Sequence, residues 1–481
     1  MHDGQTSLEE LRKALAQRDA EIASRDAEIA RLTAEVTRLT EQVQALQERL
    51  GQDSSNSSKP PSSDGPTSRN RSKQARRERK SGRKRGGQKG HKGHRRALLP
   101  ESEVNELIEL YPAECENCWK ALPEVSDPYA KRHQVTELPP VKAHTTEYRR
   151  HKVRCPHCNY RTRAKQDERV PKTSFGPRLS SILAMLTGVY HLSRRQAQRV
   201  SSDLFGVRIS LGALSAIEAR VSDAIKPVVD EAWAKAHDAN VKYTDGTSWK
   251  QAGVAMQLWT LATTAVTVFK IILDGSKETL KPLFGKLKGI LHSDRAKALN
   301  FWAMAFRQIC WAHLLRKFVS FSERDGPAGH YGRQLLEYTG IIFSYWQDIK
   351  SGSLSRNAFV HRMAPLRQQV ESLLEKAVAA NIPRLSGSCA DILAHRAALW
   401  TFVEQRDVEP TNNHAEQELR AFVLWRRRSF GSQSTRGNEF AENIMTVAHT
   451  ARKQRRHILT VLTDCVKAQL AGISPPSLFS A

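Results

Sequence analysis

The chain has 481 residues and a formal net charge of +25 at pH 7, with a sequence pI near 9.9. Its length allows two or three domains with separate cores, and so large an excess of positive charge indicates a polyanionic partner, with nucleic acid the first candidate. No apolar run approaches the roughly 20 residues of a membrane-spanning helix, and the polar, acidic N-terminus does not fit a secretory signal. We therefore expect a cytoplasmic protein that does not bind membranes.

Residues 1–51 are predicted to form a coiled coil that joins two or more copies of the chain. The a positions of its heptads hold Leu8, Leu15, Ile22, Ile29, Val36, Val43 and Leu50, and the d positions include Leu11, Leu32, Leu39 and Leu46. β-Branched residues at a with Leu at d favour a parallel homodimer. Arg18 and Arg25 fall at d, which predicts a weaker first half. A single helix packed against the rest of the chain is the alternative.

Residues 52–68 are rich in Ser and Pro and are predicted to be a flexible linker. Residues 69–98 form a basic segment, in which the stretch from Arg69 to Arg96 has fourteen Lys or Arg and one Glu. Such a segment binds DNA by releasing the counterions of the phosphates. The residues expected to make these contacts are Arg83, Lys84, Arg85, Lys89 and Lys92. A solvated tail that only aids solubility is the alternative.

A zinc-binding module is predicted for residues 105–170. Two C-x-x-C pairs, CENC and CPHC, are separated by thirty-six residues and consist of Cys115, Cys118, Cys155 and Cys158. Two thiolate pairs on tight turns can complete a tetrahedral, structural Zn²⁺ site. The separation exceeds the usual spacing of about 15 to 20 residues, so an inserted loop is required. A redox pair or unligated thiols are the alternatives.

Residues 175–235 are predicted to be helical, and part of this region resembles a helix-turn-helix. SRRQAQRVSSDLFG gives a first helix that ends at Gly206, and SLGALSAIEARV gives a second that begins at Ser210. Short Ser-capped helices of this kind can enter the major groove of DNA. They are equally common in ordinary helical bundles.

Residues 238–325 alternate as strand, strand, strand, helix, strand, helix, strand, helix, which predicts a mixed sheet with helices on its faces. The first strand carries Asp245 into a Gly-containing turn, and the fourth ends on Asp294. Residues 330–405 have a helical pattern and are predicted to be an insertion. Residues 408–470 then complete the core and end in an amphipathic helix.

Three acids in this region, Asp245, Asp294 and Glu416, suit a site for two divalent cations that act on a phosphodiester. Mg²⁺ takes few protein ligands, chiefly carboxylates, and two ions about 4 Å apart activate the attacking oxygen and stabilise the leaving one. Asp245 would contact both ions. The alternatives are an exposed ion pair of Glu416 with Arg420 at i+4 and a helix-capping role for Asp294.

The order of these parts resembles the transposases of the IS66 family of bacterial insertion sequences over nearly the whole chain. The matching segments are the N-terminal heptads, QDSSNSSKPPSSD, RKRGGQKGHKGH, the two C-x-x-C pairs, YTDGT, CWAHLLRKF, and NNHAEQELR followed by WRRRSFGSQSTRG. The resemblance implies an RNase H-like core whose DDE triad is Asp245, Asp294 and Glu416, with two Mg²⁺ or Mn²⁺ ions. It also implies a bacterial, nucleoid-associated protein that binds terminal repeats and target DNA, with companion proteins of the same element as further partners.

Supporting residues follow from the same resemblance. Cys310 and His313 match a supporting motif near the second acid in several DDE groups, and a buried structural His is the alternative for His313. Asn413 and Arg420 belong to the matching NNHAEQELR segment and are expected to support the third acid.

The chain departs from the family pattern at three places, one of which is Gln417, where the family usually has Arg after the third acid. The family usually has an acid directly after the first Asp, where this chain has Gly246. A DGY-type string is usual after the second Asp, where this chain has Arg295, Ala296 and Lys297. The three acids themselves are retained, so the implied reaction class is unchanged.

The sequence therefore predicts a multidomain α/β protein with α-helical parts that acts as a DNA transposase, cutting element ends and joining the freed 3′-hydroxyls to target DNA. Arg426, Arg427 and Arg428 of WRRRSF are expected to bind DNA phosphates, with Trp425 and Phe430 beside them for base stacking. Two alternatives remain open: a non-catalytic, sequence-specific DNA-binding regulator, and an RNase H-like nuclease without strand transfer.

Overall fold

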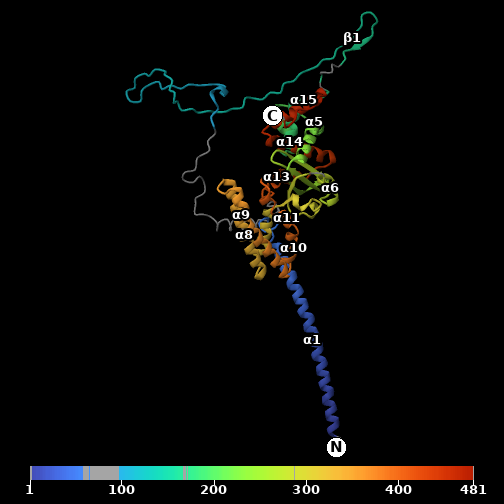
Figure 1. Ribbon diagram of the computed structural model, residues 1–481. Coiled ribbons are helices and arrows are strands. Elements are labelled where there is room, and N and C mark those ends of the chain that lie inside the picture. Colours follow the sequence, from blue (N-terminus) through green and yellow to red (C-terminus); the bar gives the residue numbers. More distant parts are fainter. Residues whose placement is uncertain are drawn as a thin grey trace. The chain divides into compact units, whose positions relative to one another are not determined.

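The computed structural model describes residues 3–57, 64, 97–165, 170, 172–285 and 288–479. Figure 1 shows the arrangement of their helices and strands, and the chain divides into two units by its internal contacts. One unit comprises Met1–Gln74, Pro177–His191 and Glu218–Ala481, and the other comprises Ala75–Gly176 and Leu192–Ile217. The predicted DNA contacts Arg83, Lys84, Arg85, Lys89 and Lys92 lie outside the described residues.

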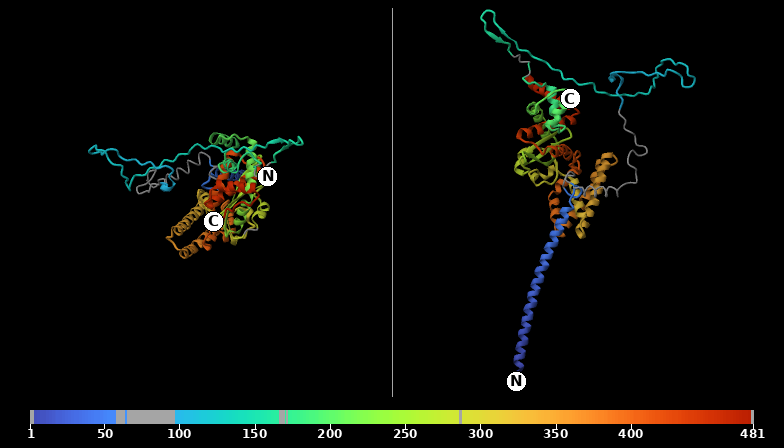
Figure 2. Two further views of the ribbon diagram at one scale, coloured as in Figure 1. Left: turned by 90° about the horizontal axis from the view of Figure 1, so that it is seen from above. Right: turned by 180° about the vertical axis from the view of Figure 1, so that it is seen from behind.

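The N-terminal helix α1 spans Asp3–Leu50 without a break, and Figure 2 shows it as one continuous helix. The prediction of a helical N-terminus is confirmed. Its heptad side chains are exposed on the single chain, with Ile29 at 61% and Val36 at 62%. Exposed apolar residues in this repeat are what a helical partner would cover, so self-association stays a prediction.

The residues after α1 differ from the expected flexible linker. Asp53 and Asn56 are buried, and the Asp53 N–H donates to Asn56 Oδ1 at 2.8 Å. Ser54 N–H donates to Asp64 Oδ1 at 2.8 Å, and Asn56 Nδ2 donates to Glu323 Oε2 at 2.8 Å. Short Asp, Asn and Ser side chains accept hydrogen bonds from nearby backbone N–H groups and so stabilise a turn. The composition of this segment alone predicts a flexible linker.

The two helices expected around Gly206 are present. Helix α4, Arg194–Phe205, begins with a capping box made by Ser193 and Gln196 and ends at Gly206, whose φ is 65°. A Gly in this left-handed conformation is the usual helix stop. Helix α5, Leu211–Asp238, continues far beyond the segment expected from the sequence. Helix α3, Pro177–Gly188, precedes both.

A mixed five-stranded sheet forms the centre of the larger unit, which confirms the predicted mixed sheet. Its strands are β3 (Val241–Gln251), β4 (Val254–Ala262), β5 (Thr267–Ile272), β6 (Ile290–Ser293) and β7 (Arg307–Ile309), in the order β5-β4-β3-β6-β7. β3, β4 and β5 are antiparallel neighbours, whereas β6 and β7 run parallel to β3.

Two local expectations about this sheet were wrong. β3 does not end at Asp245 but continues to Gln251 and turns at Ala252 and Gly253, whose φ values are 49° and 85°. Positive φ at both turn residues matches the two-residue hairpin that fits strand twist. Between β6 and β7 the chain forms the short 3₁₀ turns Lys297–Leu299 and Met304–Phe306 instead of the expected helix.

Helices cover both faces of the sheet. On one face, α5 and α6 (Lys277–Phe284) bury apolar side chains against Trp259, Leu261 and Leu291. On the other face lies α13 (Asn413–Ser429), whose Phe422 contacts Phe269 and Trp249. The C-terminal helices are α14 (Thr435–Lys453) and α15 (Ile458–Ala471).

Helix α14 protects the β5 edge of the sheet. The N–H groups of Thr267, Phe269 and Ile271 donate to Thr450 Oγ1 at 3.2 Å, Thr446 Oγ1 at 3.2 Å and Glu442 Oε1 at 2.8 Å. Helix residues spaced by four lie on one face of the helix, and the N–H groups of alternate strand residues point to the same edge of the sheet. The two sets of groups therefore face each other. The unpaired backbone donors of an edge strand are thereby satisfied, which prevents pairing with another chain.

A helical segment separates β7 from α13. It contains α7 (Trp311–Ser322), α8 (Gly326–Ser351), α9 (Arg356–Ala379), α10 (Ser386–Ala394), α11 (Arg396–Leu399) and α12 (Thr401–Glu404). These helices share a buried core, in which the Trp311 ring packs on Trp400 at 5.0 Å and its Nε1 donates to Leu399 O at 2.8 Å. In the part of the chain that the structure describes, no helix is long and apolar enough to cross a membrane.

Packing against Trp259 explains why residue 246 is a glycine. It pairs with Trp259 across β3 and β4, and a Cβ atom at residue 246 would lie 2.8 Å from Trp259 Cε2. A side chain cannot approach a ring so closely without a shift. The acid that the family usually has at this position would therefore require a different residue in place of Trp259.

We expect Gly246→Ala to lower the free energy of unfolding by about 1–3 kcal/mol, because the added methyl group overpacks against the Trp259 ring. Gly340→Ala is the matched control, since nothing lies within 4 Å of its added Cβ. Thermal unfolding of both variants measures the difference, and adding Trp259→Leu to Gly246→Ala should restore part of the loss. Equal unfolding of Gly246→Ala and Gly340→Ala would contradict the packing argument.

Candidate functional site

Asp245 lies within β3, and Asp294 directly follows the adjacent parallel strand β6. Tyr243 of β3 is in register with His292 of β6, and the two acids follow two residues further along each strand. Alternate strand residues share a face, so both carboxylates lie on the face that α13 covers. The sequence interpretation assigned Asp245 to a turn, whereas the structure places it within β3.

The charges of Asp294 and Glu416 change the pKa of Asp245. Burial, followed by the charges of Asp294 and Glu416, raises the pKa of Asp245 to about 7. A hydrogen bond from the Gly246 N–H to Asp245 Oδ1, at 2.8 Å, opposes this shift. Carboxylates whose pKa is raised by burial and by neighbouring acids are common at functional sites.

A buried arginine holds the loop that carries Asp294. Arg307 of β7 is fully buried and donates from Nη2 to Asp294 O at 3.1 Å and from Nη1 to Asn300 Oδ1 at 3.0 Å. Asp294 Oδ1 also accepts the Ala296 N–H at 2.9 Å, which is a local turn and not the helix cap weighed in the sequence, because the 3₁₀ turn that follows begins without a side-chain cap. The sequence analysis did not single out Arg307. A charged residue within a short buried strand could have indicated it, because charged side chains are rarely buried without a specific partner.

Asn412 joins the start of α13 to the sheet. Its Nδ2 donates to Thr244 O at 2.8 Å, directly before Asp245, and its N–H donates to Cys310 Sγ at 3.1 Å. The side chain is fully buried. These bonds fix the start of α13, whose first turn carries Glu416. Asn413, which the sequence favoured as a supporting residue, is exposed.

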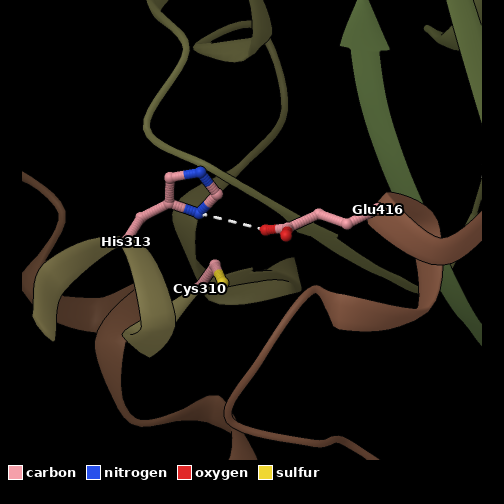
Figure 3. Close-up of side chains that lie close together, drawn as sticks. All are labelled: Cys310, His313 and Glu416. Atoms are coloured by element: carbon pink, nitrogen blue, oxygen red, sulfur yellow. Dashed lines mark ion pairs between the residues drawn. The ribbon is translucent and has the colours of Figure 1, made fainter. Parts of the chain in front are cut away.

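Glu416 faces α7 rather than its own helix. Its Oε1 lies 3.7 Å from His313 Nδ1, and its Oε2 lies 3.5 Å from Arg316 Nη2. Figure 3 shows His313 and Glu416 pointing toward one another, with Cys310 beside them. Arg420, the partner expected from the i+4 spacing, is exposed. Arg316 was not singled out in the sequence.

Cys310, His313 and Glu416 form the only group of three or more His, Cys, Asp or Glu ligand atoms that lie within 4.8 Å of one another in the described residues. Burial lowers the pKa of His313 and raises the pKa of Cys310 to about 11. The imidazole is therefore neutral and the thiol protonated at pH 7.

The site fits a divalent cation. Asp245, Asp294 and Glu416 offer the oxygen ligands that Mg²⁺ and Mn²⁺ take, but their carboxylate oxygens do not all lie within 4.8 Å of one another. Glu416 Oε1 and His313 Nδ1 are buried and have no hydrogen-bond partner in the structure, and buried polar atoms are normally paired. A cation at this position would satisfy both atoms and relieve the repulsion that raises the pKa of Asp245.

A family model described as Transposase IS66 family matches residues 172–440. The chain belongs to the IS66 transposase family. Members of this class bind and cut DNA and generally need a divalent metal. A second model, a family of unknown function, matches residues 10–97. No curated protein matches the chain.

The matched region of this IS66 transposase contains the whole sheet, the helical segment and the three acids. Its boundary also includes α13, where the predicted DNA contacts Arg426, Arg427 and Arg428 lie. Arg426 Nη1 donates to Thr247 Oγ1 at 3.2 Å, so this guanidinium is bound to β3. Arg427 and Arg428 are exposed.

The two aromatic residues of the same segment, Trp425 and Phe430, differ in their exposure. Trp425 stacks on His191 at 4.8 Å and packs edge-on against Trp249 at 6.0 Å, so its ring is engaged within the protein and does not serve the base stacking expected from the sequence. Phe430 is 76% exposed.

The two C-x-x-C segments of the transposase form equivalent turns. In each turn the carbonyl oxygen of the first Cys accepts a hydrogen bond from the N–H four residues later. The Trp119 N–H donates to Cys115 O at 2.8 Å, and the Asn159 N–H donates to Cys155 O at 2.9 Å. Backbone N–H donors within each turn lower the pKa of Cys115 and Cys155. The four thiols are not drawn together into one cluster among the described residues.

Replacement of Asn412 by Ala should weaken the site, because it removes the bond that holds α13 to Thr244 O. We expect a loss of about 1–3 kcal/mol in the free energy of unfolding, together with weaker Mn²⁺ binding in a titration of the purified chain. Asn413→Ala is the matched control and should change neither quantity. An Asn412→Ala chain that binds Mn²⁺ as the wild type does would show that Glu416 needs no such anchor.

Proposed function

We propose that this IS66 transposase is a DDE enzyme in which Asp245, Asp294 and Glu416 hold two Mg²⁺ or Mn²⁺ ions. One observation carries the proposal: β3 and β6 are parallel neighbours, and the charges of Asp294, directly after β6, and of Glu416 on α13 both help to raise the pKa of Asp245 to about 7. The strand order, with three antiparallel strands followed by two parallel ones, supports an RNase H-like core. Two divalent ions would supply activation of the attacking oxygen and stabilisation of the leaving oxygen.

The protein's own part in this mechanism is positioning. Arg307 fixes the backbone of Asp294, and Asn412 fixes the helix that carries Glu416. Hydrolysis at an element end breaks a P–O3′ bond and frees a 3′-hydroxyl. That hydroxyl then attacks a target phosphodiester, so that one P–O bond forms as another breaks. No covalent protein intermediate is required, and orientation provides much of the rate enhancement.

The accessory parts have roles that follow from their chemistry. Cys115, Cys118, Cys155 and Cys158 would hold one structural Zn²⁺, since each pair already has the tight turn that places two thiolates on one ion. The exposed heptads of α1 would join two copies of the chain and so hold both element ends. The basic segment at residues 69–98 would bind DNA phosphates without sequence preference.

Helix α13 supplies a path for DNA away from the acids. Its exposed residues are Asn413, Gln417, Arg420, Leu424, Arg427 and Arg428, and none of them is acidic. They are spaced by three or four and therefore lie along one side of the helix. A helix rises about 1.5 Å per residue, so this side leads about 20 Å from Glu416 to the end of the helix.

Phe430 ends this path in a fixed position. It has φ 58°, a conformation uncommon for residues other than Gly, and it is followed by Gly431, where a Cβ would lie 2.1 Å from Lys250 O. Ser432 N–H donates to Lys250 O at 3.0 Å, and Ala252 N–H donates to Ser432 O at 2.8 Å. The β3 hairpin thus holds the turn, and we propose that Phe430 stacks on an unpaired base while Arg427 and Arg428 bind phosphates.

Asp245→Asn should reduce strand transfer by about a thousandfold or more, as loss of one member of a catalytic unit typically does. The assay uses the purified chain, Mg²⁺, DNA from the element ends and a target plasmid. Asp230→Asn, on the exposed face of α5, is the matched control and should retain wild-type joining.

Other outcomes of this assay separate the alternatives. Equal joining by Asp245→Asn and wild type would overturn the triad. A wild type that cuts ends but never joins them would be a nuclease, and one that binds DNA without cutting, with Asp245→Asn keeping every cellular activity, would be a regulator.

Phe430→Ala should weaken binding to an element end that carries an unpaired base by about 5- to 100-fold, since base–aromatic stacking contributes about 1–3 kcal/mol. Phe430→Tyr keeps the ring and should bind as the wild type does. Leu424→Ala, another exposed apolar residue of the same segment, controls for loss of apolar surface. The measurement is the fluorescence of 2-aminopurine at the unpaired base, and equal quenching by Phe430→Ala and wild type would contradict the stacking proposal.

A further inference from the structure

We propose that His313 is a nitrogen ligand of the divalent ion held by Glu416, and that this position therefore selects Mn²⁺ over Mg²⁺. The inference rests on the proposed role of Glu416 as a metal ligand. It adds a fourth residue to the three acids and assigns a metal preference that three carboxylates alone would not give.

The distance between the two side chains supports a shared ion. His313 Nδ1 and Glu416 Oε1 are 3.7 Å apart, which is too long for a hydrogen bond. Both atoms are buried without a hydrogen-bond partner in the structure. With each ligand atom about 2.1 Å from one ion, a separation of 3.7 Å corresponds to an angle of about 120° at that ion. Figure 3 shows the two groups pointing toward one another across this space.

The two ligands are held in place by separate elements. His313 lies on α7 and Glu416 on α13, and the Trp311 N–H donates to Pro410 O at 2.9 Å just before α13 begins. The Asn412 N–H donates to Cys310 Sγ at 3.1 Å. Cys310 is therefore a positioning residue that ties the two helix starts together. A pair of ligands arranged in this way loses little conformational freedom on binding an ion.

Arg316 contacts the other atom of each ligand group. Its Nη2 lies 3.5 Å from Glu416 Oε2, and its Nη1 lies 3.5 Å from His313 Nε2. Both contacts are at the outer limit of a hydrogen bond, and they leave Glu416 Oε1 and His313 Nδ1 for an ion. Mg²⁺ favours oxygen ligands, whereas a nitrogen ligand stabilises Mn²⁺ and the later transition metals.

The test is a metal titration of the full chain, with Zn²⁺ supplied beforehand to fill the Cys sites. The loss of the free Mn²⁺ signal in electron paramagnetic resonance gives the Mn²⁺ affinity, and competition gives the Mg²⁺ affinity. We expect the wild type to bind Mn²⁺ at least about tenfold more tightly than Mg²⁺, and His313→Gln to lose about 10- to 100-fold in Mn²⁺ affinity and less than about threefold in Mg²⁺ affinity. His361→Gln, an exposed histidine on α9, is the control and should bind as the wild type does.

A second measurement does not depend on the folding of a variant. Pulsed electron paramagnetic resonance of the Mn²⁺-loaded wild type should show modulation from a directly bonded ¹⁴N nucleus. Its absence, or Mn²⁺ affinity unchanged in His313→Gln, would overturn the proposal.

Strand-transfer activity separates this proposal from the proposed function. If the wild type joins DNA while His313→Gln binds Mn²⁺ normally, the ligand assignment fails and the transposase function stands. If His313→Gln weakens Mn²⁺ binding but the wild type joins no DNA in either metal, the metal site stands and the function fails.

Discussion

The charges of Asp294 and Glu416 act on the buried carboxylate of Asp245, and contacts elsewhere in the larger unit fix the segments that carry these acids. β3 and β6 are parallel and in register, which places the start of the Asp294 loop beside β3. Asn412, at the start of the helix that carries Glu416, bonds to Thr244 O, one residue before Asp245. The energetic strain of this arrangement is visible in Asp245, whose pKa is raised to about 7. Burial of uncompensated charge is costly, and a divalent cation is the natural compensation.

The helical segment between β7 and α13 keeps the third acid in place although the chain leaves the sheet before reaching it. The segment has a buried core of its own and is fixed to β7 of the sheet by α12, where the Phe402 N–H donates to Gln308 Oε1 at 2.7 Å. Arg295 pairs with Asp391 of α10 at 2.7 Å. The departure from the family pattern after Asp294 thus has a structural counterpart, because Arg295 joins the acid loop to the helical segment. An addition of this kind can vary in sequence without moving the acids.

Local sequence patterns predicted the elements better than the contacts between them. The heptads, the Ser and Gly helix ends and the alternating strands gave α1, α4 and the mixed sheet, because these depend on neighbours in the sequence. The roles of Arg307, Arg316 and Asn412 depend on partners far along the chain, so spacing could not reveal them. The role of Gly246 also depends on a distant partner. The residue departs from the family pattern, and packing against the Trp259 ring requires it to be a glycine. The turn at Asp53 was missed because its composition is that of a linker.

The central claim is that Asp245, Asp294 and Glu416 hold the same metal centre, and Fe²⁺-directed cleavage of the polypeptide tests it most directly. Fe²⁺ bound in place of Mg²⁺ produces hydroxyl radicals with ascorbate and peroxide, and these cut the backbone next to the ion. The account predicts cuts near residues 245, 294 and 416 in the zinc-loaded chain, all suppressed together by excess Mg²⁺ or Mn²⁺. Cuts near only one of these acids, or cuts that Mg²⁺ and Mn²⁺ leave unchanged, would contradict it.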